Sequence, residues 1–160
     1  MKEYINFLRA YLNSCFLAEA EFLGTHFNVC EAYDYNNDLS CPQIAIQTLD
    51  DAEAEQYTSF EAENVTRVGV QINVFAENMK IDGTTYTAKD ACEKIADIIK
   101  TYMNKLRFEA VNSNIVRLVR VGKDYTMPLS KSGQVYVSVL RYDSLVVCPY
   151  LRELENLKEI

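Results

Sequence analysis

The single histidine and the five cysteines are the residues of this chain whose types could support metal binding or nucleophilic catalysis. His26 and Cys30 form a His-x3-Cys pair, which places two kinds of metal ligand close together. Structural zinc sites normally pair their ligands as C-x2–4-C, however, and no two cysteines here have that spacing. Nor does a local nucleophile signature surround any cysteine. We therefore expect no metal site and no catalytic residue, while an enzyme that uses His26 with a thiol or carboxylate is kept as an alternative.

Glycine-rich phosphate loops are missing from the sequence. Neither G-x-x-x-x-G-K-[ST] nor G-x-G-x-x-G occurs among the five glycines, so nucleotide enzymes of those two classes are not expected. The carboxylates of residues 50–64 lack the D-x-[DN]-x-[DN]-G spacing of a calcium loop. They also lie on a segment with little to desolvate a glycosidase pair. No cofactor is predicted.

Charge is divided unevenly along the chain, whose net charge is −7. Residues 1–64 contain 12 acids and 2 bases, a balance of −10, and residues 65–160 contain 11 acids and 14 bases, a balance of +3. The segment 50–64 has no base to offset its acids, which are Asp50, Asp51, Glu53, Glu55, Glu61 and Glu63. We interpret it as an exposed acidic loop, and loops of this length are often functional or mobile.

Basic residues gather near the last two predicted strands, and Arg117, Arg120 and Lys123 are the first of them. Binding to a phosphate backbone needs a basic field, whereas the whole chain is acidic with a sequence pI near 4.8. We therefore expect no sequence-specific binding to nucleic acid. These three bases and the six acids of residues 50–64 are instead our candidate interface between protein surfaces.

Hydrophobic periodicity predicts two helices. Apolar residues at helical spacing indicate a helix over residues 4–23 that ends at Gly24. A second helix is predicted over residues 88–106, with Thr87 and Asp90 as a variant capping box. The residues that follow position 150 are expected to form a last helical turn or two, or a flexible tail.

Alternating apolar residues predict the strands. The stretch TRVGVQINVFAENM places Val68, Val70, Ile72 and Val74 on one face of a strand over residues 65–75. Two shorter candidates, residues 27–33 and 43–47, are expected to form a hairpin, and two more strands are expected within residues 114–122 and 133–147. The predicted fold class is α/β (α+β): one domain over residues 1–160, with a mixed, mainly antiparallel sheet of four to five strands packed against two helices. The predicted order is helix, hairpin, strand, helix, strand, strand.

Cysteine usage and the first residues favour a cytoplasmic setting. The start MKEYINFLRAYL has no clean apolar region followed by a cleavage site, and five scattered cysteines are an odd number. Reduced thiols are therefore expected. Cys15 and Cys92 fall in the apolar stripes of the predicted helices and are expected to behave as small hydrophobes.

Five segments in succession carry a resemblance to a known family: PQIAIQTLDDAE, FEAENVTRVGVQINVFAENM, GTTYTAKDACEKIADIIKTYM, NIVRLVRVGK and GQVYVSVLRYDSLV. Their pattern is a short strand after Pro42, an acidic loop, the V-x-V-x-I-x-V-F-A strand, a helix rich in Ala, Ile and Lys, and a closing strand ending in R-Y-D. Over residues 42–147 this pattern resembles the tail terminator family of long-tailed bacteriophages and phage-like particles.

The resemblance implies a structural role. Tail terminators form a ring, usually hexameric, that caps the head-proximal end of the tail tube, stops its polymerisation and offers a surface to the head connector. The implied partners are other copies of the chain, the tail tube protein and a connector or neck protein, with no membrane, and DNA would pass through the ring. The implied location is the virion tail, after assembly in the bacterial cytoplasm. A head-tail connector or neck protein is the alternative within virions, and a small cytoplasmic enzyme using His26 is the alternative from another class.

Overall fold

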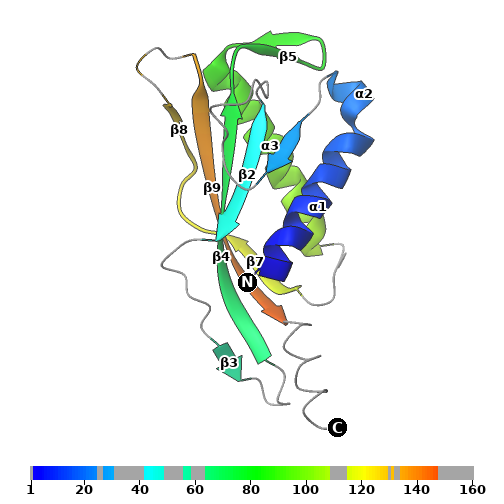
Figure 1. The fold of residues 1–160 in the computed structure, drawn as a ribbon, viewed down its shortest axis with the longest axis vertical. Coiled ribbons are helices and arrows are strands. Elements are labelled where there is room, and N and C mark those ends of the chain that lie inside the picture. Colours follow the sequence, from blue (N-terminus) through cyan, green and yellow to red (C-terminus); the bar gives the residue numbers. More distant parts are fainter. Residues whose placement is uncertain are drawn as a thin grey trace.

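The computed structural model describes residues 2–24, 27–30, 42–48, 56–58, 64–108, 115–129, 131 and 134–147. For some of these, Arg117 among them, only the backbone is described. The helices are α1 (Lys2–Ala18), α2 (Ala20–Leu23) and α3 (Ala88–Phe108). The strands are β1 (Asn28–Cys30), β2 (Gln43–Thr48), β3 (Gln56–Thr58), β4 (Asn64–Ala76), β5 (Met79–Ile81), β6 (Thr84–Tyr86), β7 (Ile115–Arg120), β8 (Tyr125–Pro128) and β9 (Tyr136–Val147). Figure 1 shows these elements arranged around one elongated sheet.

The two longest strands, β4 and β9, form the centre of the main sheet. They are antiparallel and pair from Val65↔Val147 to Ala76↔Tyr136. The continuous path of the sheet is β1-β2-β4-β9-β7, while β3 pairs with β4 and β8 pairs with β9. The predicted fold class, a mixed and mainly antiparallel sheet with two main helices, is confirmed.

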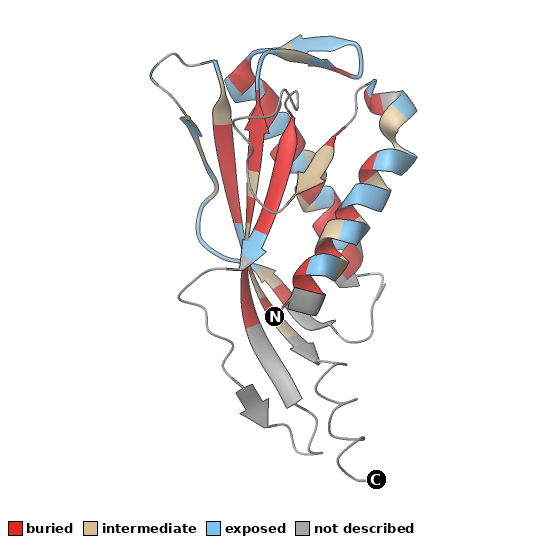
Figure 2. Cartoon of the chain, viewed as in Figure 1, coloured by how far each residue is buried: buried red, intermediate tan, exposed pale blue. Residues whose placement is uncertain are grey.

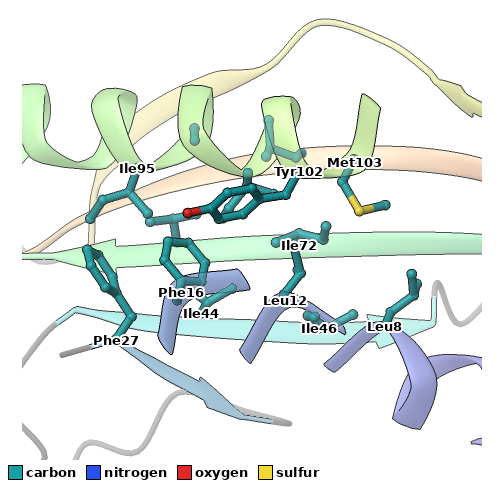
Figure 3. Packing of buried hydrophobic residues seen from close by; sticks show 14 of the residues in the cluster. Leu8, Leu12, Phe16, Phe27, Ile44, Ile46, Ile72, Ile95, Tyr102 and Met103 are labelled. Atoms are coloured by element: carbon teal, nitrogen blue, oxygen red, sulfur yellow. The ribbon is translucent and has the colours of Figure 1, made fainter. Parts of the chain in front are cut away.

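Helices α1 and α3 cover the same face of the sheet. Alternation in β4 turns Val68, Val70, Ile72 and Val74 toward the helices, and all four are buried in one cluster with residues of α1 and α3. Figure 3 shows the side chains of both helices meeting those of β2 and β4. The largest fully buried side chains are Leu8, Leu12, Phe16, Ile44, Ile46, Ile72, Ile81, Ile95, Ile99, Met103, Leu106 and Leu140. Each such side chain contributes about 1.5–3 kcal/mol when it is removed from water.

Helical boundaries follow local capping. The predicted first helix is interrupted at Glu19, and the short α2 ends at Gly24, whose φ of 72° is left-handed and suits a residue without a Cβ. At the start of α3, the Thr87 hydroxyl accepts a hydrogen bond from the Asp90 N–H at 3.4 Å. The Asn78 side chain also accepts one from the Ala88 N–H at 2.8 Å. Two side chains therefore satisfy N–H groups that the helix itself leaves unpaired.

The predicted hairpin between residues 27–33 and 43–47 is wrong in direction. The two strands are neighbours, but β1 runs parallel to β2, with Asn28 opposite Gln43 and Cys30 opposite Ala45. A parallel pair requires a connection of about a dozen residues or more, and residues 31–42 provide that length. Alternation alone identifies strands without giving their direction.

Four strands lie outside the predicted set. β5 and β6 form a small hairpin around Asp82 and Gly83, whose φ values are 50° and 73°. β8 occupies the stretch around Pro128 that was expected to be a loop. β3 falls within the segment 50–64 and pairs with β4, with Gln56 opposite Thr66. These three residues therefore extend the sheet inside the segment that we interpreted as a loop.

Candidate subunit interface

The six predicted acidic residues, Asp50, Asp51, Glu53, Glu55, Glu61 and Glu63, lie outside the described residues. β3 is the part of their segment that the structure describes, and it is paired in the sheet. The contact expected between these acids and the basic residues therefore stays a prediction.

The predicted bases occupy β7 and the turn that follows it. Arg117 is placed by its backbone in β7, and Lys123 is exposed. Arg120 is also exposed, but its Nη1 lies 2.9 Å from Oδ2 of Asp124. The charge of Arg120 is thus partly offset within its own subunit, which the sequence did not reveal.

Lys100 of α3 joins this group of charges. Its ammonium contacts the same carboxylate of Asp124 and also lies 3.4 Å from Asp97. Lys100 and Arg120 are far apart in sequence and are brought together because α3 packs beside β7. No periodic signal marked Lys100, since a lysine on an exposed helical position is usually only solvated.

A hollow of about 370 Å³ lies beside this ion cluster. It is lined by Lys100, Met103, Asn104, Leu118, Val119, Arg120 and Tyr142. Burial raises the pKa of Tyr142 to about 12, while the nearby Arg120 acts to lower it and Asp124 to raise it. The tyrosine hydroxyl therefore keeps its proton at neutral pH and offers a donor at the wall of the hollow.

The face of the sheet that points away from α1 and α3 has a polar part and an apolar part. In the polar part, Gln71 donates to Asn73 at 3.0 Å, and Nε of Arg141 donates to Gln71 at 3.3 Å. The apolar part is a second buried cluster, made of Ala45, Phe75, Val137 and Val139. Within the described part of the chain, all members of this cluster lie on strands or on the turn between β8 and β9, with none from a helix.

Large apolar side chains are exposed at a few places only in the described residues. They are Leu17 on α1, Val121 after β7, and Tyr125 and Met127 on β8. A second hollow, of about 330 Å³, lies between α1 and β1 and is lined by Asn6, Arg9, Ala10, Asn13 and Val29. Neither surface was singled out from the sequence, in which Tyr125 and Met127 fall between the strands predicted within residues 114–122 and 133–147.

Thiols and other ligating groups give no metal cluster in the part of the chain that is described. No group of three or more His, Cys, Asp or Glu side chains there could hold a metal ion. Cys15, Cys30 and Cys92 are thiols that form no disulfide, and Cys92 is buried, as expected for a residue in the apolar stripe of α3. His26, Cys41 and Cys148 lie outside the described residues.

A helix that crosses a membrane must be both long and apolar. None of the described helices meets both requirements. The apolar stripe of α1 is used for packing on the sheet, where Leu8 and Leu12 are fully buried.

Comparison with known proteins gives a likeness in fold. No family model matches the sequence, and no curated protein matches it. Among solved structures, the chain is similar to one chain of the structure described as "Virion of native gene transfer agent (GTA) particle". The two share 13% sequence identity with a TM-score of 0.50, and the match covers 79% of this chain and 82% of that chain. At this identity the likeness shows a common fold.

Proposed function

We propose that this chain is a structural protein of a phage or phage-like particle and that its specific role is that of a tail terminator. The observation that carries the proposal is the fold shared with a chain of a gene transfer agent virion, which extends over most of both chains. The resemblance of residues 42–147 to tail terminators points the same way. The shared fold and the resemblance both rest on the overall pattern of strands and helices. Fold alone does not define function, so the tail terminator role is a proposal.

The architecture suits a part that has to keep its shape. β4 is 13 residues long, which corresponds to about 40 Å of extended chain, and it pairs with β9 along almost its whole length. One face of this ladder is packed against α1 and α3. Such a ladder is stiff because backbone hydrogen bonds join the two strands at every second residue pair and because one face is close-packed against the helices.

In this proposal the copies form a ring, as a hexamer, at the head-proximal end of a tail tube. The ring stops tube growth and receives the head connector, and DNA passes through it. The six acids of residues 50–64 in one copy, or an acidic surface of the tube, meet Arg117, Arg120 and Lys123 of a neighbouring copy. The protein then resides in the virion tail after assembly in the bacterial cytoplasm.

Tail length is the measurement that tests the role. Deleting the gene in the strain that produces the particle should give tubes longer than normal and heads without joined tails, because nothing would stop tube polymerisation. Supplying the wild-type gene should restore one tail length. Tubes of normal length joined to heads in the deletion strain would overturn the proposal. Normal tube length with unjoined heads would instead support the alternative of a connector or neck protein.

The proposal also holds that the chain is not an enzyme, and His26 provides the test. A His26→Ala variant should assemble normally and give infectious or DNA-transferring particles, because no chemistry depends on that side chain. Particles that assemble fully around a folded variant and yet lose all activity would favour the small enzyme that uses His26.

A further inference from the structure

Exposed apolar side chains concentrate along one edge of the main sheet. Three of the four large hydrophobic side chains exposed in the described residues, Val121, Tyr125 and Met127, fall within one short stretch. Tyr125 and Met127 are 44% and 47% exposed, and they lie opposite Val139 and Val137 on the face of the sheet that points away from α1 and α3. Single exposed hydrophobic residues are ordinary, but a group of this kind marks an interaction surface.

The backbone of this edge favours contact through side chains over addition of a further strand. The Leu129 N–H donates to the Val135 carbonyl at 2.8 Å, so the odd-numbered residues of β8 turn their backbone groups toward β9. Thr126 and Pro128 therefore turn theirs outward, and Pro128 has no N–H to donate. A proline in that position protects a free edge from strand pairing.

The opposite edge of the same sheet has a hollow whose wall is partly apolar and partly polar. β1 forms that edge, and the hollow of about 330 Å³ lies between it and α1. Its wall combines the apolar surface of Ala10 and Val29 with the amides of Asn6 and Asn13 and with Arg9, whose guanidinium donates to Oδ1 of Asn6 at 2.6 Å. One turn beyond Asn13, Leu17 is 54% exposed.

Beyond Arg9, the exposed residues of α1 carry no charge over more than two turns. Its exposed residues from position 10 to the end of the helix are Ala10, Asn13, Ser14, Leu17 and Ala18. A solvent-facing helical surface normally bears charged side chains, and interfaces are depleted of charge at their centre. In Figures 1 and 2, β8 and this exposed side of α1 lie on opposite sides of the molecule.

We propose that Tyr125 and Met127 of one copy insert into the hollow between α1 and β1 of the next copy. The two surfaces are unlike and lie at opposite edges of one sheet, and a contact between two different patches of identical subunits is one that can close into a ring. The chemistry matches, because tyrosine buries its ring while its hydroxyl reaches a polar partner such as Asn6 or Asn13. The flexible methionine fills the remaining apolar space. This inference rests on the proposed ring and names the residues of its central contact.

A charge placed on the patch tests the contact. We expect Met127→Asp to raise the concentration at which rings form by at least about tenfold, the effect of losing a central interface residue. Sedimentation velocity over a dilution series, with negative-stain images at the highest concentration, measures it. Thr85→Asp is the matched control, because it adds the same charge at an exposed position of β6 and should leave assembly unchanged.

Filling the hollow tests the other half of the contact. Ala10→Trp should block rings to a similar degree, whereas Lys94→Trp at an exposed position of α3 should not. Circular dichroism and the unfolding midpoint of each variant establish that the fold is intact. If Ala10→Trp misfolds, a Met127→Cys, Ala10→Cys double variant tests the same contact. A short bismaleimide should cross-link neighbouring copies of this variant into a ladder of oligomers that the wild-type protein does not form.

The outcomes separate this inference from the proposed function. Rings of normal stability in both Met127→Asp and Ala10→Trp would overturn the inference and leave the tail terminator role standing. Met127→Asp rings of normal stability that fail to bind tail tubes would also overturn the inference, since the patch would then contact the tube. A wild-type protein that forms no ring at any soluble concentration, and none on tubes, would overturn the proposed function itself.

Discussion

The hydroxyl of Tyr102 on α3 donates a hydrogen bond to the Glu19 carboxylate, with 2.5 Å between the oxygens. Glu19 is the residue that separates α1 from α2. The Tyr102 ring also meets Phe16 edge to face with centroids 5.1 Å apart, and Phe16 stacks on Phe27 at 4.6 Å (Figure 3). The first helical segment is therefore fastened to α3 at the point where its own hydrogen bonding is interrupted.

Removing the Tyr102 hydroxyl should destabilise the protein. We expect Tyr102→Phe to lower the free energy of unfolding by about 1.5–3 kcal/mol, the usual range for a hydrogen bond to a charged group. Burial, followed by the hydrogen bond and charge of Glu19, raises the pKa of Tyr102, so the donor is present at neutral pH. Urea unfolding measures the change, and Tyr125→Phe at an exposed position is the control. Equal stability of the two variants would show that this hydrogen bond contributes little.

Strong periodicity explains which elements were predictable from the sequence. β4 and α3 were located because their apolar residues recur at regular spacing, at every second residue in β4 and on one side of successive turns in α3. The burial of Val68 and Ile95 follows that pattern. β5 and β6 were missed because three residues carry no periodic signal. β8 was missed because Gly122 and Pro128 are typical of loops, although proline is tolerated on an edge strand.

The candidate interface was less predictable than the fold, because it depends on contacts between distant segments. The sequence identified Arg120 as a base in an acidic chain but could not show that Asp124 binds it or that Lys100 contacts the same carboxylate. The hollow between α1 and β1 has no sequence signal either. Its lining joins residues of α1 to Val29 of β1, and the sequence does not show that these two segments lie side by side.

The two faces of β4 should respond differently to truncation. Ile72 is fully buried between the helices and the sheet, so Ile72→Ala should cost about 2–5 kcal/mol through lost burial and the cavity left behind. Gln71, its neighbour on the other face, is half-buried, and Gln71→Ala should cost less than about 1 kcal/mol. Chemical denaturation of both variants is the comparison. A larger loss for Gln71→Ala would mean that the face pointing away from α1 and α3 contributes more to stability than the face that they cover.

Stability should fall at alkaline pH because tyrosines are buried in the core. Burial raises the pKa of Tyr4 to about 12, although its hydrogen bond to Ser144 acts to lower it. The folded state therefore keeps a proton that the unfolded chain loses near pH 10.0. This contribution is fully present below pH 10 and is lost as the pH rises through about 12.

Urea unfolding between pH 9 and pH 11.5 tests this dependence on Tyr4. Tyr4→Phe should be less stable at pH 9, because Ser144 loses its 2.7 Å partner, and should then show a shallower decline as the pH rises. Tyr125→Phe should keep the wild-type slope. Parallel declines in all three proteins would show that other groups set the alkaline limit.

The thiols should titrate as free groups with different accessibility. Cys15 and Cys30 are half-buried and Cys92 is buried, and none of the three forms a disulfide. Cys92 also donates to the Tyr136 carbonyl at 3.0 Å. In the folded protein Cys92 should react with a thiol reagent far more slowly than Cys15, and unfolding without reductant should release nearly all five cysteines of the chain. Recovery of a single thiol would indicate two disulfides and contradict the expectation of a reducing compartment.

Salt dependence tests the charged part of the proposed ring contact. Lys123 is the cleanest position for a charge reversal, because it is exposed, whereas reversal of Arg120 would also break its ion pair with Asp124. An exposed ion pair contributes about 0.2–1 kcal/mol, so Lys123→Glu should weaken association by up to about fivefold at 0.1 M salt. Lys80→Glu on β5 is the control, since it changes the net charge equally.

Screening should then remove the difference between the charge variants. The screening length falls from about 10 Å at 0.1 M salt to about 3 Å at 1 M, so wild type and Lys123→Glu should associate equally at high salt. Rings should persist there if the central contact is apolar, because hydrophobic burial is not screened. Sedimentation velocity across this range is the measurement. An equal and salt-independent affinity in all three proteins would show that the acidic residues 50–64 do not meet this basic surface, and complete dissociation at 1 M would show that charge alone holds the copies together.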